Sequence, residues 1–131
     1  MGYYGNNRTA EVSELLGKTI VGIKGNESDD EMYIKTSDGK EYKFYHNQDC
    51  CESVSIQDVE GDLLDLLDSP LTQAEESTSD TLEGREDLEY DSQTWTFYKF
   101  ATIKGYVTVR WYGTSNGYYS ESVDFEEIIN D

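Results

Sequence analysis

The chain has 131 residues, close to the usual size of one folding unit, so we expect a single domain over residues 1–131. Its formal net charge of −18 argues against unspecialised binding to nucleic acid or to an anionic membrane, and it favours a basic partner. Aromatic residues make up 13% of the chain, with eleven Tyr, which indicates a folded core rather than a disordered acidic tail.

The sequence also carries signals about the compartment. No window of about 18 apolar residues is present, and the first residues lack the apolar stretch of a secretory signal. The two cysteines, Cys50 and Cys51, are neighbours, and adjacent cysteines rarely have disulfide geometry. We therefore expect a cytoplasmic protein.

The first quarter of the chain predicts two short elements after a loose start. Residues 1–10 are rich in Gly, Asn and Tyr and are predicted to be flexible. Residues 11–16 place three apolar side chains on one helical face, and Gly17 can end that turn. Residues 19–24 are rich in β-branched side chains and predict a strand.

A hairpin follows. Residues 31–36 and 41–46 alternate apolar and polar side chains, and Asp38-Gly39 stands in the turn between them. An Asp-Gly pair between two alternating runs is a strong hairpin signal, so we predict two paired antiparallel strands here.

The middle of the chain changes its periodicity twice. Residues 53–59 alternate as a strand does, whereas residues 62–68 have helical spacing that ends before Pro70. A further strand is predicted over residues 71–77. Residues 78–92 have no apolar periodicity, so they are predicted to form an acidic loop or a disordered insert.

The last third has the clearest strand pattern. Residues 93–103, 106–112 and 118–125 alternate and are separated by short turns, which predicts a three-stranded antiparallel meander. The expected inward positions are Trp95, Phe97, Ala101, Ile103, Val107, Val109, Trp111, Tyr119, Val123 and Phe125. The predicted fold is therefore a β-rich α+β domain, in which the N-terminal hairpin and this meander form an antiparallel sheet with one or two short helices.

The negative charge is concentrated in one segment. Residues 49–92 contain fifteen acidic residues and only one basic residue, Arg85. Within residues 62–68 an Asp recurs every third position, which would place these carboxylates on one broad face of a helix. Duplex DNA presents one charge per roughly 1.7 Å of axis, so a dense row of carboxylates can occupy the phosphate channel of a DNA-binding protein. The partner-binding candidates are Asp58, Glu60, Asp62, Asp65, Asp68, Glu75 and Glu76. The alternative is a solvated face that keeps a small protein soluble.

A second candidate surface combines aromatic and basic side chains. Tyr106, Arg110 and Tyr112 alternate with the expected core residues of their strand, so they are predicted to face outward. Tyr and Arg are enriched in interface hot spots and in platforms that stack on bases. Packing against the hairpin, or against a second copy in a homodimer, is the alternative.

A third candidate is a group of metal-ligand residue types. His46, Asp49, Cys50 and Glu52 are close in sequence, with Cys51 beside them, but no second ligand pair of the kind that structural zinc requires is present. An incidental His beside a buried Cys is therefore favoured over a metal site or a catalytic thiol with His46 as its base. No phosphate-binding Gly-rich motif and no Gly-x-Ser-x-Gly motif is present, so we expect neither a cofactor nor an enzyme.

Two stretches resemble a family of small phage- and prophage-encoded proteins of unknown function. They are TWTFYKFATIKGYVTVRWYGTSNGYYSESVDF, residues 94–125, and YHNQDCCESV, residues 45–54. The likeness covers roughly residues 15–127, and it implies no catalytic residues. It implies a phage origin, and with it a role as an antagonist of a host factor, as anti-CRISPR proteins have.

The function predicted from these observations is inhibition of a host nucleic-acid-handling defence protein, foremost a CRISPR nuclease. The chain would bind a basic channel of that protein through an acidic, DNA-mimicking surface, without binding nucleic acid or a membrane itself. Three alternatives stay open. They are a sponge for a small nucleotide signal with a pocket of Tyr, Trp111 and Arg110, a metal-binding protein or hydrolase built on the His46 region, and a self-assembling phage structural protein.

Overall fold

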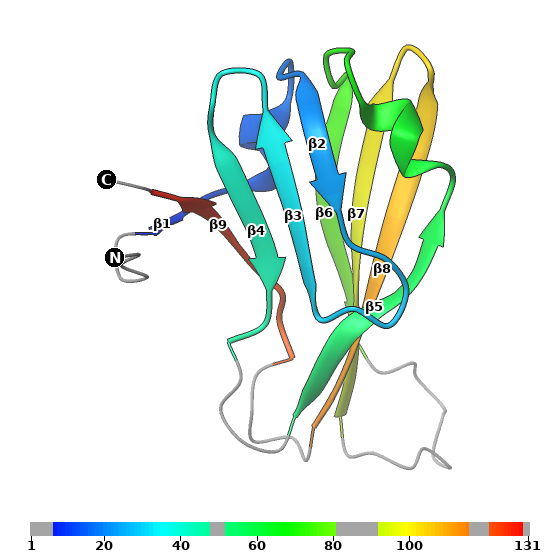
Figure 1. Ribbon diagram of the computed structural model, residues 1–131. Coiled ribbons are helices and arrows are strands. Elements are labelled where there is room, and N and C mark those ends of the chain that lie inside the picture. The colour runs from blue at the N-terminus through cyan, green and yellow to red at the C-terminus, as the bar shows by residue number, and fades with distance from the viewer. Residues whose placement is uncertain (1–6, 48–51, 81–91, 116–120, 130–131) are drawn as a thin grey trace.

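The protein is a sandwich of two antiparallel β-sheets, as the computed structural model shows for residues 7–47, 52–80, 92–115 and 121–129 (Figure 1). The first sheet has the order β1 (Arg8–Thr9), β9 (Asp124–Ile128), β4 (Glu41–Tyr45), β3 (Glu31–Thr36) and β2 (Ile20–Lys24). The second has the order β5 (Ser53–Glu60), β8 (Gly105–Ser115), β7 (Ser92–Thr102) and β6 (Gln73–Asp80). Two 3-10 turns, η2 (Val12–Leu15) and η3 (Leu63–Leu66), complete the described part. No helix within these residues has the length and apolar character needed to cross a membrane.

The core lies between the two sheets, and aromatic side chains fill its centre. The Phe44 ring lies 4.7 Å from the Tyr98 ring in an edge-to-face arrangement and 4.5 Å from the Phe125 ring. Phe44 and Phe125 come from the first sheet and Tyr98 from the second. This cluster therefore joins the two layers, as the interdigitating inner faces of a sandwich do.

The local elements predicted from short-range patterns are confirmed. The hairpin of β3 and β4 pairs Met32 with Phe44 and Ile34 with Tyr42, and all four side chains are buried. The predicted helical turn near residue 12 is η2, and the predicted strands at residues 19–24, 53–59 and 71–77 correspond to β2, β5 and β6. The β-rich, antiparallel character of the prediction is therefore correct.

The inward face predicted for β7 is wrong. Trp95, Phe97 and Ala101 lie on the outer face and are half-buried, whereas Tyr98 and Phe100 are fully buried. The strand has aromatic residues on both faces, so alternation alone could not choose between them. The choice is made by β8, where Tyr98 pairs with Val109 and Phe100 with Val107, both of which face the core.

The predicted three-stranded meander is also wrong in its third strand. Strands β7 and β8 form a hairpin, but β9 pairs with β4 and β1 in the opposite sheet. Val123 and Phe125 are buried as predicted, and Phe125 stacks on Tyr42 of the first sheet at 5.3 Å. Tyr119 lies outside the described residues. The single predicted sheet is thus divided into two.

Both segments predicted to be loose include residues that lie in strands. Arg8 and Thr9 form β1, and the Arg8 guanidinium makes ion pairs with Glu14 at 2.6 Å and with Glu127 at 2.8 Å. Residues 78–80 belong to β6 and residue 92 to β7, so they are not part of a loop. Asn7 and Ala10, on either side of β1, also contact β9, since the Ala10 amide donates to the carbonyl oxygen of Phe125 and the Asn7 side-chain amide to Glu126. Residues 1–6 and 81–91 of these two predictions lie outside the described residues.

Candidate functional site

The structure separates the predicted acidic residues into two groups. Strands β5 and β6 are opposite edges of the second sheet, and at about 4.8 Å per strand step these edges lie about 14 Å apart. Glu75 and Glu76 lie on β6. The other five, which we call the acidic arc, follow β5 and the segment after it: Asp58, Glu60, Asp62, Asp65 and Asp68.

The acidic arc does not follow one helix face, because the predicted helix over residues 62–68 is only the single turn η3. The Asp62 carboxylate caps this turn by accepting a hydrogen bond from the Leu64 amide at 3.0 Å, and Asp65 lies within the turn. Asp68 follows it with a φ of 65°, a left-handed conformation that Asp tolerates better than most residues. The carboxylates therefore lie along a bend of the chain.

Hydrogen bonds fix this bend to both sheets. The Thr102 hydroxyl donates to the carbonyl oxygen of Asp65, and the Lys104 ammonium donates to the carbonyl oxygen of Leu67. The amide of Asp68 donates to the carbonyl oxygen of Ile20 in β2 at 2.8 Å. The acidic arc is thus held in place before any partner arrives, which lowers the entropic cost of binding.

Large apolar side chains are exposed at the same end of the sandwich, where η3 and the turn between β7 and β8 lie (Figure 1). Leu64 is 64% exposed, Ile103 88% and Tyr106 72%, and we call these three residues the apolar group. Of the four Leu residues in 62–68, only Leu66 is fully buried. Exposed apolar side chains rimmed by charge are typical of protein interfaces.

Two glycines let the η3 segment approach the β7–β8 hairpin. A Cβ on Gly61 would lie 2.6 Å from the carbonyl oxygen of Tyr106, and its φ of 99° is itself unfavourable for other residues. A Cβ on Gly105 would lie 3.0 Å from Asp65 Oδ2. These contacts place the acidic arc directly beside the exposed hairpin turn.

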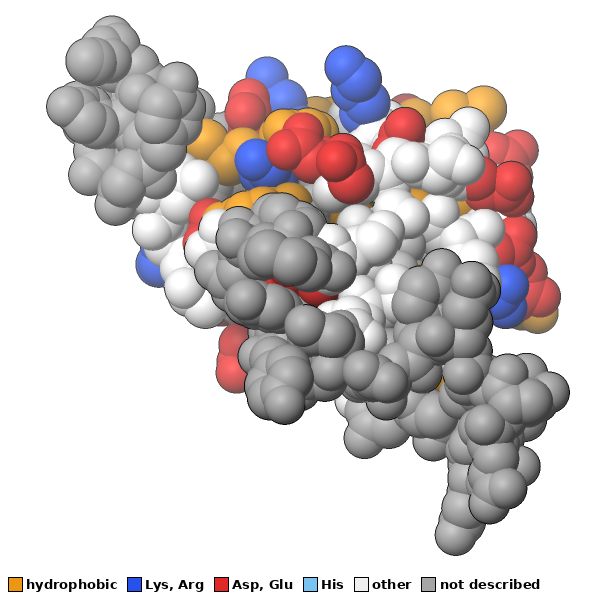
Figure 2. Space-filling view, turned by 90° about the horizontal axis from the view of Figure 1, so that it is seen from below, with side chains coloured by type: hydrophobic (Ala, Val, Ile, Leu, Met, Phe, Trp, Pro, Cys, Tyr) orange, Lys and Arg blue, Asp and Glu red, His pale blue; other side chains and the backbone are white. Residues whose placement is uncertain are grey.

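The acidic arc is only partly neutralised by bases. Arg110 Nη2 lies 3.8 Å from Asp58 Oδ2, and Arg110 Nε donates to Gln57 Oε1 at 2.7 Å. No other ion pair involves an acidic arc residue in the described part of the chain. Seen from the opposite end, Asp and Glu side chains gather on the right-hand side, where the second sheet lies, with few Lys or Arg among them (Figure 2).

The predicted outward aromatic and basic residues do face outward. Tyr106, Arg110 and Tyr112 alternate with buried residues of β8, and Tyr112 packs on Trp95 at 5.2 Å. Trp111, however, is fully buried, because successive residues of a strand point to opposite faces. A pocket lined by both Trp111 and Arg110 therefore does not form.

His46 and Glu52 come together in a buried pair at the other end of the sandwich. Their side chains are 4% and 0% exposed, and His46 Nε2 lies 2.8 Å from Glu52 Oε2. His46 Nδ1 lies 2.7 Å from the carbonyl oxygen of Ser122, and because a carbonyl only accepts, Nδ1 carries a proton. With both ring nitrogens engaged, His46 could serve as a base or bind a metal only after breaking a hydrogen bond.

Three other residues of that candidate metal site, Asp49, Cys50 and Cys51, lie outside the described residues. No group of three or more His, Cys, Asp or Glu suited to a metal ion occurs among the residues that the structure describes.

Sequence reasoning missed a buried carboxylate near the same end. Glu121 accepts hydrogen bonds from the Thr94 hydroxyl at 2.7 Å and the Ser115 hydroxyl at 2.5 Å. A Cβ on Gly113 would lie 2.9 Å from Glu121 Cβ, so the glycine makes room for this approach. A lone Glu after a Gly/Ser-rich turn carries no sequence signal for burial.

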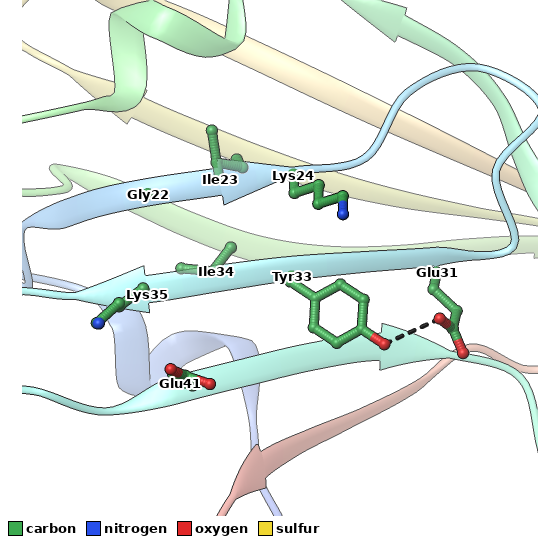
Figure 3. A pocket seen from close by; sticks show the side chains of 8 residues that line it. All are labelled: Gly22, Ile23, Lys24, Glu31, Tyr33, Ile34, Lys35 and Glu41. Carbon is green, nitrogen blue, oxygen red and sulfur yellow. Dashed lines mark hydrogen bonds between the residues drawn. The ribbon is translucent and has the colours of Figure 1, made fainter.

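Sequence reasoning also missed a hollow on the outer face of the first sheet. It has a volume of about 590 Å³ and is formed by β2, β3 and β4 (Figure 3). Gly22, Lys24, Tyr33 and Lys35 are among its lining residues. The one available signal was a Gly inside a run of β-branched residues, which often marks a close approach by another group.

A comparison with known protein families gives one match. The model of a domain of unknown function, DUF7448, matches residues 13–125. No curated protein and no solved structure matches the chain.

Proposed function

The chain belongs to the DUF7448 family, whose function is unknown, and we propose that it acts by binding a basic partner protein rather than by catalysis. The binding surface is the end of the sandwich that holds the acidic arc and the apolar group. In its most specific form, the proposal is that the chain inhibits a host nucleic-acid-handling defence protein in the cytoplasm, foremost a CRISPR nuclease, by occupying its basic channel.

The observation that carries the proposal is Leu64, which is 64% exposed between Asp62, whose carboxylate caps the turn, and Asp65 within the same turn. Burying a whole Leu side chain contributes about 1.5–3 kcal/mol, so covering the exposed part of Leu64 contributes about 1–2 kcal/mol. An exposed Leu within a rigid acidic turn is costly for solubility. It becomes useful when a partner supplies an apolar pocket with a basic rim.

The strand part of the acidic arc supports the comparison with nucleic acid. Asp58 and Glu60 both face outward from β5, opposite Arg110 and Thr108. Residues two apart on a strand are separated by about 6.8 Å, which is two nucleotide steps of about 3.4 Å along one DNA strand. The carboxylates thus have a spacing that cations placed for phosphates can meet.

A capture experiment with matched variants tests the proposal. The immobilised protein is exposed to host extract at low salt, and bound proteins are identified by mass spectrometry. The D62N/D68N variant removes two charges from the acidic arc, while Asn keeps a capping oxygen and tolerates the left-handed φ. The control E75Q/E76Q removes two charges from the opposite edge of the same sheet.

We expect the wild type and the control to capture a basic protein that D62N/D68N does not capture. Leu64→Ser should bind the same protein about tenfold more weakly than the wild type does. Equal capture by all variants would overturn the proposed surface. For the nuclease form, duplex DNA should compete with the chain for its partner, and competition should weaken as salt rises. A partner that binds DNA and the chain simultaneously would contradict channel occupation while leaving the surface intact.

A further inference from the structure

The hollow on the first sheet offers a site that is separate from the proposed partner surface. It lies on the outer face of β2, β3 and β4, and its volume of about 590 Å³ is that of a small-molecule pocket (Figure 3). Tyr33 and Lys35 of β3 border it, and Gly22 and Lys24 of β2 face them in the strand register. The acidic arc belongs to the other sheet.

Gly22 borders an irregularity in the pairing of β2 with β3, between Ile20 and Gly22, and it leaves the floor of the hollow open. Its φ is not in the left-handed region, and a Cβ added there would meet only Lys35 Cβ, at 3.8 Å. Any L-residue could therefore occupy the position, and a β-branched one would strengthen the strand. Glycine at this position preserves space above the sheet.

Two lysines beside the hollow have no ion-pair partner among the residues that the structure describes. Lys24 and Lys35 take part in none of the ion pairs found in the described residues, although the chain carries 28 acidic residues. Glu31, the nearest carboxylate on β3, is already paired with Lys43 at 3.2 Å. Lys24 and Lys35 occupy diagonal positions in the register around Gly22 and Tyr33, and their side chains point toward opposite ends of the hollow (Figure 3). Glu41, which pairs with Lys35 in the register of β3 and β4, also lines the hollow. One anionic group contacts both lysines when the two flexible side chains turn toward the centre of the hollow.

Tyr33 supplies a ring that is held in place. Its hydroxyl donates to Glu31 Oε1 at 2.9 Å, as Figure 3 shows, and the Lys43 ammonium lies 5.8 Å from the ring centroid. A side chain fixed at its hydroxyl end presents a defined face for stacking. The ring and the two ammonium groups thus border one hollow.

We propose that this hollow binds a small planar molecule carrying one anionic group, a class that includes nucleoside monophosphates. The planar part stacks on Tyr33 and extends over β2 toward Gly22, and the anionic group lies between Lys24 and Lys35. Charge-assisted hydrogen bonds to the two ammonium groups supply most of the specificity. A proposed partner at the acidic arc is not required for this binding.

Amide chemical shifts in NMR titrations test the site, with AMP, adenosine and inorganic phosphate as probes at millimolar concentration. We expect AMP to shift the amides of residues 22–24 and 33–35, and adenosine and phosphate each to bind at least tenfold more weakly. Equal binding of adenosine and AMP would overturn the anionic contact, and equal binding of phosphate and AMP would overturn the stacking contact. Shifts elsewhere, or none with AMP, would overturn the site.

Variants separate binding from folding. Gly22→Val should raise the melting temperature, because Val favours a strand, and should abolish AMP binding, because it fills the floor. Lys24→Gln and Lys35→Gln should each weaken AMP binding about tenfold, while Lys40→Gln, a control in the β3–β4 turn, should leave it unchanged. Undiminished AMP binding by Gly22→Val would refute the proposal even if the lysine variants behaved as expected.

Discussion

Replacing His46 by Leu should be among the most destabilising single changes in this chain. The substitution removes two hydrogen bonds of the imidazole and leaves the Glu52 carboxylate, which is 0% exposed, without its imidazole partner. Removing one partner of a buried pair formed by a carboxyl group and a basic side chain typically costs about 3–5 kcal/mol. A domain of this size is expected to have a total stability of about 5–15 kcal/mol.

The expected loss is therefore about 3–5 kcal/mol, and at about 4 °C per kcal/mol the melting temperature should fall by about 12–20 °C. Urea denaturation at neutral pH, followed by the fluorescence of buried Trp111, measures the loss directly. Glu52→Gln should cost less, because its side-chain amide can still form a hydrogen bond with Nε2.

The double variant H46L/E52L distinguishes pairing from simple packing. Because it removes both polar groups together, its loss should be smaller than the sum of the two single losses. A loss below about 1 kcal/mol for His46→Leu, or a strictly additive double variant, would refute the reasoning.

Three further outcomes are expected. Burial and the nearby Glu76 carboxylate raise the pKa of Tyr98. The stability that this group contributes is therefore present below about pH 10 and is lost as the pH rises above it. In thermal melts, the melting temperature of Tyr98→Phe should fall less at alkaline pH than that of the wild type. Hydrogen bonds from Lys18 and Thr36 lower the pKa of Asp38. The stability that Asp38 contributes is therefore present above about pH 4 and is lost as the pH falls below it. In the same assay, the melting temperature of Asp38→Asn should fall less in acid than that of the wild type. Gly61→Ala should lower the free energy of unfolding by at least about 1–3 kcal/mol, measured by urea denaturation, because the Cβ would meet a backbone carbonyl oxygen at a left-handed φ. A urea denaturation curve equal to that of the wild type would contradict the close approach.

Local pairing could be predicted from the sequence, but the assignment of strands to sheets could not. The β3–β4 and β7–β8 hairpins follow from alternating runs joined by short turns. Alternation reports which side chains share a face, not which strand lies alongside. The sequence pattern of β9 therefore fits pairing with β8 as well as pairing with β4. Only its packing against Tyr42 and Phe44 places it in the other sheet.

For the candidate site, the density of acidic residues was visible and their arrangement was not. Helical spacing over residues 62–68 predicted a regular helix, but hydrogen bonds to Ile20 and Thr102 limit it to a single turn. The exposed Leu64 could not be distinguished in the sequence from buried Leu66, because each follows the same Leu-rich pattern. Tertiary contacts, which no local pattern contains, decided both features.

The position of β9 determines the order in which the protein can be completed during synthesis. The four strands of the second sheet are all present once residue 115 has been made, whereas β4 keeps an unpaired edge, and β1 has no partner, until residues 124–128 follow. Nascent chains should therefore expose the β4 edge on the ribosome, and unpaired edges recruit strands from other copies. Truncation before β9 would turn that brief exposure into a permanent one, so shortened products of this chain should aggregate rather than fold.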